Sequence, residues 1–121
     1  MNIKRLCTAV LLAGAAFAAH AADSTPIADC VDLGTNQEIV RGGGAQSMLL
    51  RDGDAHYLVG FRGNCSSLAT ASSIEISTDG AANRLCPKGS QVKTNRSTCS
   101  VGKVETLDAE EFASRKKRIT R

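Results

Sequence analysis

The sequence predicts a small α+β domain, in which a mainly antiparallel sheet is followed by one C-terminal helix and stapled by two disulfides. Three observations predict this: removal of an export signal leaves about 100 of the 121 residues, four cysteines remain, and β-type patterns precede a well-marked helix. A chain this short, with no Trp, buries only a thin core and needs cross-links. Its size excludes doubly wound nucleotide-binding enzymes, TIM barrels and multidomain proteins.

Residues 1–21 have the parts of an export signal in the usual order. Lys4 and Arg5 form a basic start, an apolar run of about 14 residues follows, and the small-residue site Ala19-His20-Ala21 ends it. The run is shorter than the ~20 residues that a membrane anchor needs. We therefore expect a signal peptide over 1–21, a single exported domain over 22–121 with no membrane span, and a bacterial periplasmic or secreted location.

Loss of Cys7 with the signal leaves four cysteines, Cys30, Cys65, Cys86 and Cys99. An even number in a small exported domain predicts two disulfides. A four-thiolate zinc site is the alternative, but no C-x2-C pair is present. Three pairings are possible, and we expect Cys86–Cys99 and Cys30–Cys65 because turn residues between Cys86 and Cys99 favour a segment that folds back on itself.

The clearest strand signal is a hairpin over residues 46–50 and 55–61, joined by Arg51-Asp52-Gly53-Asp54. Asp-Gly favours a tight turn because both residues accept positive φ. In the second strand Tyr57, Val59 and Phe61 share the expected core face. Further strands are expected at 74–77 before the turn Asp79-Gly80, near 84–86, near 91–93, and near 99–106, where Gly102 interrupts the alternation. The Gly-rich segment 41–45 is expected as a flexible connector.

The helix signal begins at Asp108, which is expected to cap a helix that starts at Ala109. Glu111 completes a capping-box-like pair, and Leu107 faces Phe112 as a hydrophobic staple. Acidic residues at the start and a basic end over 115–118 complement the helix dipole.

Charge is distributed unevenly along the chain. The signal holds two of the 15 basic residues and none of the 12 acidic ones, so the net charge falls from +3 to +1 after cleavage. Five basic residues lie within 115–121, which leaves residues 22–114 with a net charge of −4. The basic tail can attract an anionic partner, although helix electrostatics explain most of it. We expect a protein or envelope-component partner and no nucleic acid.

Residues suited to catalysis are few. Asp52, Asp54 and His56 have a spacing that would share one strand face and hold a metal, but acidic residues at a turn are the simpler interpretation. His56 is the only histidine after cleavage, no G-x-S-x-G is present, and the adjacent Glu110 and Glu111 diverge around a helix. We expect no enzyme activity, no cofactor and no metal.

Four polar residues beside turns are candidate partner contacts: Arg62, Asn64, Asn95 and Arg96. Their alternative role is turn formation.

Several short segments also resemble a family of short exported proteobacterial domains of unknown function, over about residues 29–107. The segments are Cys30-Val31-Asp32-Leu33, the hairpin that ends in Tyr57-Leu58, Asn64-Cys65-Ser66-Ser67-Leu68, Arg84-Leu85-Cys86, and Cys99-Ser100-Val101-Gly102-Lys103-Val104. The resemblance implies one disulfide-bearing α+β domain and brings no catalytic residues. The chain departs from the pattern at Pro87-Lys88-Gly89, where members often carry an acidic residue.

These observations favour a non-catalytic binding or interaction module of the cell envelope. The alternative is an inhibitor of an extracellular or periplasmic hydrolase, because rigid loops lose little entropy on binding. Its expected contact loops are 63–68 and 87–96.

Overall fold

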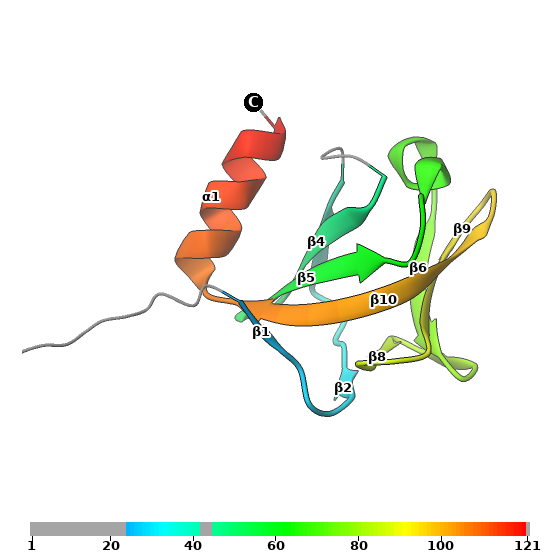
Figure 1. The fold of residues 1–121 in the computed structure, drawn as a ribbon, viewed down its shortest axis with the longest axis horizontal. Helices are drawn as coiled ribbons and strands as arrows, with labels where there is room; N and C mark the ends of the chain where they lie inside the picture. The colour runs from blue at the N-terminus through cyan, green and yellow to red at the C-terminus, as the bar shows by residue number, and fades with distance from the viewer. Residues whose placement is uncertain (1–23, 42–44, 121) are drawn as a thin grey trace, which may run out of the picture.

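The computed structural model describes residues 24–41 and 45–120. The expected signal peptide and Gly42, Gly43 and Gly44 of the expected connector lie outside the described residues. The described part consists of antiparallel strands, a short 3₁₀ helix and one C-terminal α-helix, which confirms the predicted fold class (Figure 1).

The main sheet has strands in the order β3-β4-β5-β10-β9-β6-β7, with β1 added on β10, and all neighbours are antiparallel. A separate two-stranded sheet pairs β2 with β8. The strand bounds are β1 Ser24–Pro26, β2 Val31–Asp32, β3 Gln37–Val40, β4 Ser47–Asp52, β5 Ala55–Phe61, β6 Ile74–Thr78, β7 Ala81–Ala82, β8 Arg84–Leu85, β9 Ser90–Thr94 and β10 Thr98–Leu107.

Strand β10 joins two parts of the strongly curved sheet. Its first residues pair with β9, and its last residues pair with β5 on one side and β1 on the other. Figure 1 shows β10 in orange sweeping across the whole molecule. The main core fills the inside of this curve and includes Met48, Leu50, Val59, Leu68, Ile76, Leu85, Val92, Val101 and Val104.

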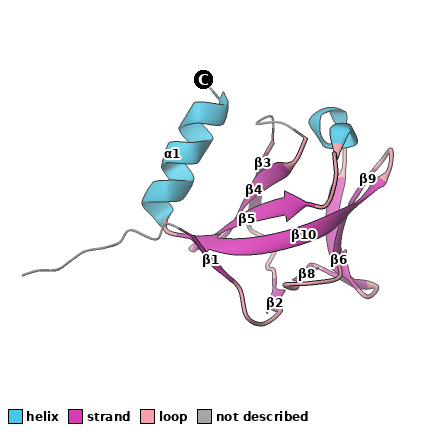
Figure 2. Cartoon of the chain, viewed as in Figure 1, coloured by secondary structure: helices cyan, strands magenta, loops and turns pink. Residues whose placement is uncertain are grey.

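Helix α1 (Ala109–Thr120) covers part of the opposite, outward face of the sheet. Leu49 and Leu107 form a second small core with Phe112 of the helix. Because Met48 and Leu50 face inward while Leu49 faces the helix, this strand is apolar on both sides. Figure 2 shows the helix and the 3₁₀ helix η1 (Ser66–Thr70) standing apart with the strands between them.

The expected start of the helix is confirmed. Asp108 Oδ1 accepts a hydrogen bond from the Glu111 amide at 2.7 Å, and the helix begins at Ala109. Leu107 and Phe112 lie in the same apolar cluster, as the staple predicts.

The two predicted turns are present, and one is displaced by a residue. Asp79 and Gly80 have φ of 51° and 81°, as a two-residue turn with two positive φ angles requires. In the first hairpin Asp52 pairs with Ala55, so the turn residues are Gly53 and Asp54. Only Gly53 of these two has a positive φ, at 60°.

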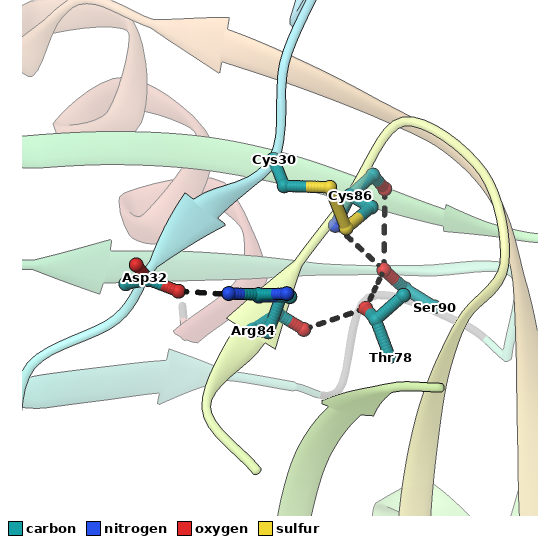
Figure 3. Close-up of a disulfide and its surroundings, with 6 residues drawn as sticks. All are labelled: Cys30, Asp32, Thr78, Arg84, Cys86 and Ser90. Carbon is teal, nitrogen blue, oxygen red and sulfur yellow. Dashed lines mark hydrogen bonds and ion pairs between the residues drawn. A yellow bond between two sulfur atoms is a disulfide. The ribbon is translucent and has the colours of Figure 1, made fainter. Parts of the chain in front are cut away.

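The disulfides are Cys30–Cys86 and Cys65–Cys99, so the expected pairing of Cys86 with Cys99 and of Cys30 with Cys65 is wrong. The register of the small sheet explains the first bond, because Val31 lies opposite Leu85. The next antiparallel pair outward is therefore Cys30 with Cys86, whose Cα atoms are 4.0 Å apart (Figure 3).

The local fold-back that the sequence suggested does form, but it places a different residue opposite Cys99. Strands β9 and β10 pair so that Cys99 lies opposite Val92. Cys86 precedes Val92 by six residues. It lies before the turn that leads into β9, where Ser90 Oγ accepts a hydrogen bond from the Cys86 amide at 2.7 Å. The short segment therefore cannot be bridged between its own two cysteines.

Candidate functional site

An open groove of about 700 Å³ lies on the outward face of the sheet, where β4, β5 and β10 run side by side beyond the helix. It is lined by Gln46, Ser47, Leu58, Gly60, Phe61, Arg62, Gly63, Asn64, Gly102 and Lys103.

A bulge in β10 places one cation in this groove. Val101 pairs with Phe61 and Lys103 pairs with Gly60, so Gly102 is an extra residue in the ladder. Val101 is buried in the main core, and strict alternation would point Lys103 the same way. The extra residue instead turns Lys103 outward while Val104 returns to the core.

Two glycines make room for the cationic side chains. A Cβ atom on Gly60 would lie 3.0 Å from Cγ and 3.2 Å from Cε of Lys103, so the lysine stem lies across Gly60. A Cβ atom on Gly102 would lie 3.2 Å from Cγ of Arg62, so the arginine stem lies across Gly102. Gly60 of β5 thus lies beneath Lys103 of β10, and Gly102 of β10 lies beneath Arg62, which follows β5.

A smaller hollow of about 160 Å³ continues from the groove toward the end of α1, and both hollows contain Ser47 and Leu58. Arg115 and Arg118 of the helix line it. Arg115 is paired with Glu111 at 2.6 Å, whereas the Arg118 guanidinium, as far as the described residues go, donates only to the Ser114 hydroxyl at 3.2 Å.

Among residues 24–41 and 45–120, the lining of the two hollows contains cations and no acidic residue. Arg62 and Lys103 form no ion pair within residues 24–41 and 45–120. Glu105 shares the outward face of β10 with Lys103 but does not line the groove. This positive surface contrasts with the net charge of −4 over residues 22–114.

The structure separates the four predicted contact residues into two pairs. Arg62 and Asn64 line the groove, whereas Asn95 and Arg96 lie in the turn between β9 and β10. Asn95 Oδ1 accepts a hydrogen bond from the Ser72 amide at 2.9 Å, so this side chain joins the turn to the segment that follows η1.

Sequence reasoning missed Lys103 and the residues Gln46 and Ser47 as parts of the groove. The spacing of the core positions 99, 101 and 104 contained the signal for Lys103. Its step changes from two to three at Gly102, and that change of phase is what a bulge produces.

The residues considered for catalysis do not converge. Asp52 accepts the Gly34 amide at 3.1 and 3.2 Å, while the His56 ring packs against Phe112 with ring centroids 4.8 Å apart. The hairpin turn separates Asp52 from His56, so the three residues 52, 54 and 56 do not lie on one strand. Burial and, secondarily, Asp52 raise the pKa of Tyr57. Among the described residues no group of three or more His, Cys, Asp or Glu side chains is arranged to hold a metal ion.

Within the described ranges, no helix combines the length and apolarity that crossing a membrane requires. The two disulfides are compatible with an exported protein, because such bonds persist in oxidising compartments. Comparison with family models, with curated proteins and with solved structures found no significant match.

Proposed function

We propose that this protein is a non-catalytic binding module of the cell envelope, exported to the periplasm or the medium, and that it binds its ligand in the groove on β4, β5 and β10. The observation that carries the proposal is the bulge at Gly102, which turns Lys103 out of the core and into the groove beside Arg62. Bulges of this kind commonly re-aim a side chain beside a functional site.

The chemistry of the groove supports binding more than catalysis. Its lining offers guanidinium, ammonium, amide and hydroxyl groups from Arg62, Lys103, Asn64, Gln46 and Ser47. These groups donate hydrogen bonds, but the lining contains no carboxylate, imidazole or thiol for general acid–base or nucleophilic steps. The site is therefore suited to hold a ligand without transforming it.

The exported location rests on the first 21 residues together with the disulfides. Mass spectrometry of the natural protein tests it: we expect a chain that begins at Ala22 with four oxidised cysteines. An intact Met1 or four thiols would contradict export.

An NMR fragment screen on the isotope-labelled protein tests the binding site. We expect fragments to shift the amide signals of Gln46, Arg62 and Lys103 together. Hits confined to the shallower hollow at Ser73 and Lys93, or no hits at all, would overturn the proposed site. Turnover of any substrate in a hydrolase panel that is lost in Lys103→Gln without loss of fold would overturn the non-catalytic assignment.

Hydrolase inhibition is the second candidate, and one observation favours it. The 3₁₀ helix η1 and the turn between β9 and β10 are joined by Cys65–Cys99 and by a 2.7 Å hydrogen bond between the Ser67 and Ser97 hydroxyls. This rigid surface would lose little entropy on binding an enzyme. Half of the expected loop 87–96 is strand β9, so only residues 87–89 and 95–96 of it remain as turn contacts.

A stoichiometric titration distinguishes this second function from the first. An inhibitor blocks a hydrolase at one molecule per enzyme, and Arg96→Ala in the exposed turn weakens the block. Inhibition that instead depends on Arg62 and Lys103 would show that the hydrolase binds at the groove and not at the turn.

A further inference from the structure

We infer that the ligand of the groove is a carboxylated glycan, that is, a chain of acidic sugars such as a polyuronate. This inference rests on the proposed function and specifies the chemistry of the same site. It follows from the arrangement of cations and neutral hydrogen-bonding groups along the groove and from the strands that form its floor.

The cations occupy both ends of an extended surface. Arg62 and Lys103 lie over β5 and β10, and Arg118 lines the hollow that continues toward the end of α1. In the part of the chain that the structure describes, no acidic residue lines either hollow. A single small anion would engage one end, whereas a chain with repeated carboxylates engages both.

Neutral hydrogen-bonding groups lie among these cations. Gln46, Ser47 and Asn64 line the same groove, and the two amide side chains make no hydrogen bond to any residue of the described part. Sugar hydroxyls between successive carboxylates are the partners that such amides and hydroxyls bind. The groove thus offers both kinds of group that an acidic glycan would engage, cations for its carboxylates and neutral hydrogen-bonding groups for its hydroxyls.

The floor of the groove disfavours an acidic peptide. Strand β5, which forms the middle of the floor, is paired with β4 on one side and with β10 on the other. An extended peptide gains affinity by adding to an unpaired strand edge, and β5 offers none there.

The floor also disfavours single-stranded nucleic acid, which needs aromatic rings that stack on bases. Tyr57 is buried in the main core, Phe112 of the helix is buried against the sheet, and Phe61 at the groove packs one side against the main core, so the described residues offer at most one partly covered ring for stacking.

Binding of hexagalacturonate to the purified protein tests the inference, with NMR to locate the site and calorimetry to measure affinity. The site variant is Arg62→Gln/Lys103→Gln, which keeps part of each stem over its glycine. The matched control is Lys88→Gln/Lys93→Gln, which removes the same charge from exposed positions outside the groove. We expect about tenfold weaker binding in the site variant, little change in the control, and loss of affinity as salt is raised.

Three further probes separate this inference from the proposed function: neutral maltohexaose, hexaglutamate and a hexathymidine strand. No binding of hexagalacturonate, or tighter binding of hexaglutamate or hexathymidine in the groove, would overturn the glycan and leave the groove as a binding site. Equal loss in the site and control variants would also overturn it, because binding would then follow total charge alone. Failure of every probe and every fragment to shift groove signals would overturn the proposed function as well.

Discussion

Glu38 on β3 is the side chain that ties the C-terminal helix to the edge of the sheet. Its carboxylate pairs with Arg51 of the neighbouring strand at 3.1 Å and with Lys116 of α1. The hydrogen bonds from Lys116 and then Arg51 hold the pKa of Glu38 below its ordinary value of 4.5. A carboxyl group with a lowered folded-state pKa stabilises the fold above the unfolded-state pKa and loses that contribution as the pH falls through the folded-state pKa.

We therefore expect Glu38→Gln to lower the free energy of unfolding by on the order of 1 kcal/mol at pH 7, because the two pairs are only partly exposed. The difference from wild type should begin to shrink as the pH falls below about 4.5, where Glu38 of the unfolded state binds a proton, and should be lost as the pH falls through the lower folded-state pKa. Urea unfolding at pH 7, 5 and 3 measures it. Asp32→Asn is the control, since the Asp32 carboxylate is 81% exposed, and its pair with Arg84 should contribute little. A Glu38→Gln difference that is constant with pH would contradict this account.

Ser90 carries a buried hydrogen-bond network beside the Cys30–Cys86 disulfide (Figure 3). Thr78 Oγ1 donates its proton to the Arg84 carbonyl at 2.7 Å. Ser90 Oγ accepts the Cys86 amide at 2.7 Å, and its one proton has two acceptors within reach, Thr78 Oγ1 at 2.7 Å and the Cys86 carbonyl at 3.2 Å.

Ser90→Ala should cost about 1–3 kcal/mol, because it removes the acceptor of the Cys86 amide and leaves the buried Thr78 hydroxyl with only its bond to the Arg84 carbonyl. Chemical denaturation of the oxidised protein measures the loss. Ser100→Ala on the exposed side of β10 is the matched control and should be nearly neutral. A Ser90→Ala protein as stable as this control would show that the hydroxyl network is dispensable.

At the scale of the element, helix α1 depends on its first turn. Asp108→Ala should cost about 1 kcal/mol through loss of the cap to the Glu111 amide, whereas Asp108→Asn keeps an acceptor and should cost less. Thermal unfolding ranks the two variants, and hydrogen exchange of the helix amides locates the effect. Equal stability of the alanine and asparagine variants would contradict the cap.

The bulge of β10 is the second element on which the groove depends. Deletion of Gly102 would shift residues 98–101 by one position, so that either Val101 or Lys103 must exchange faces and Cys99 moves away from Cys65. We expect a loss of roughly 3 kcal/mol or more, since the change disturbs core, register and disulfide together.

Gly102→Ala is the comparison that keeps the residue count. Its new Cβ would meet the flexible Arg62 side chain at 3.2 Å, so the loss of stability should be small while the arginine moves. Denaturation midpoints and the yield of the Cys65–Cys99 bond measure both variants. If the deletion were tolerated as well as the alanine, the extra residue would not set the register.

The elements that the sequence predicted well are those whose signals are local. The hairpin, β6, β9 and β10 have alternating or turn-bounded patterns, and α1 has a cap and a staple. The strands that were missed have no such signal: β1 contains Pro26, β2 has two residues, and β3 places Ile39 beside Val40 without alternation. These strands form because neighbouring chain segments supply their hydrogen bonds, which no local pattern records.

At the scale of the whole molecule, the same distinction explains the candidate site. Arg62 and Asn64 could be found because they stand in a polar segment beside a cysteine, whereas Lys103 joins them only when β5 and β10 pair around the bulge. The disulfides follow the same logic, since Cys30 meets Cys86 through a two-residue sheet between segments 56 positions apart. Pairing across such distances depends on register, and register is a property of the assembled sheet.

The two disulfides protect different parts of the molecule, and they should open in a defined order. Cys30 is exposed, whereas Cys65 and Cys99 are 1% and 9% exposed, so a thiolate reaches the Cys30–Cys86 bond more readily. Under mild reductant we expect Cys30 and Cys86 to be alkylated first, with the groove signals in the NMR spectrum retained because Cys65–Cys99 still joins β10 to the segment after β5.

Each bond closes a long loop, and on the chain-entropy model its permanent loss costs about 4 kcal/mol. The variant Cys30→Ser/Cys86→Ser should therefore keep the fold with reduced stability, while Cys65→Ser/Cys99→Ser should disturb the groove as well. Peptide mapping of the alkylated cysteines over time gives the order, and earlier labelling of Cys65 and Cys99 would show that local opening of β10, and not exposure in the folded state, controls reduction.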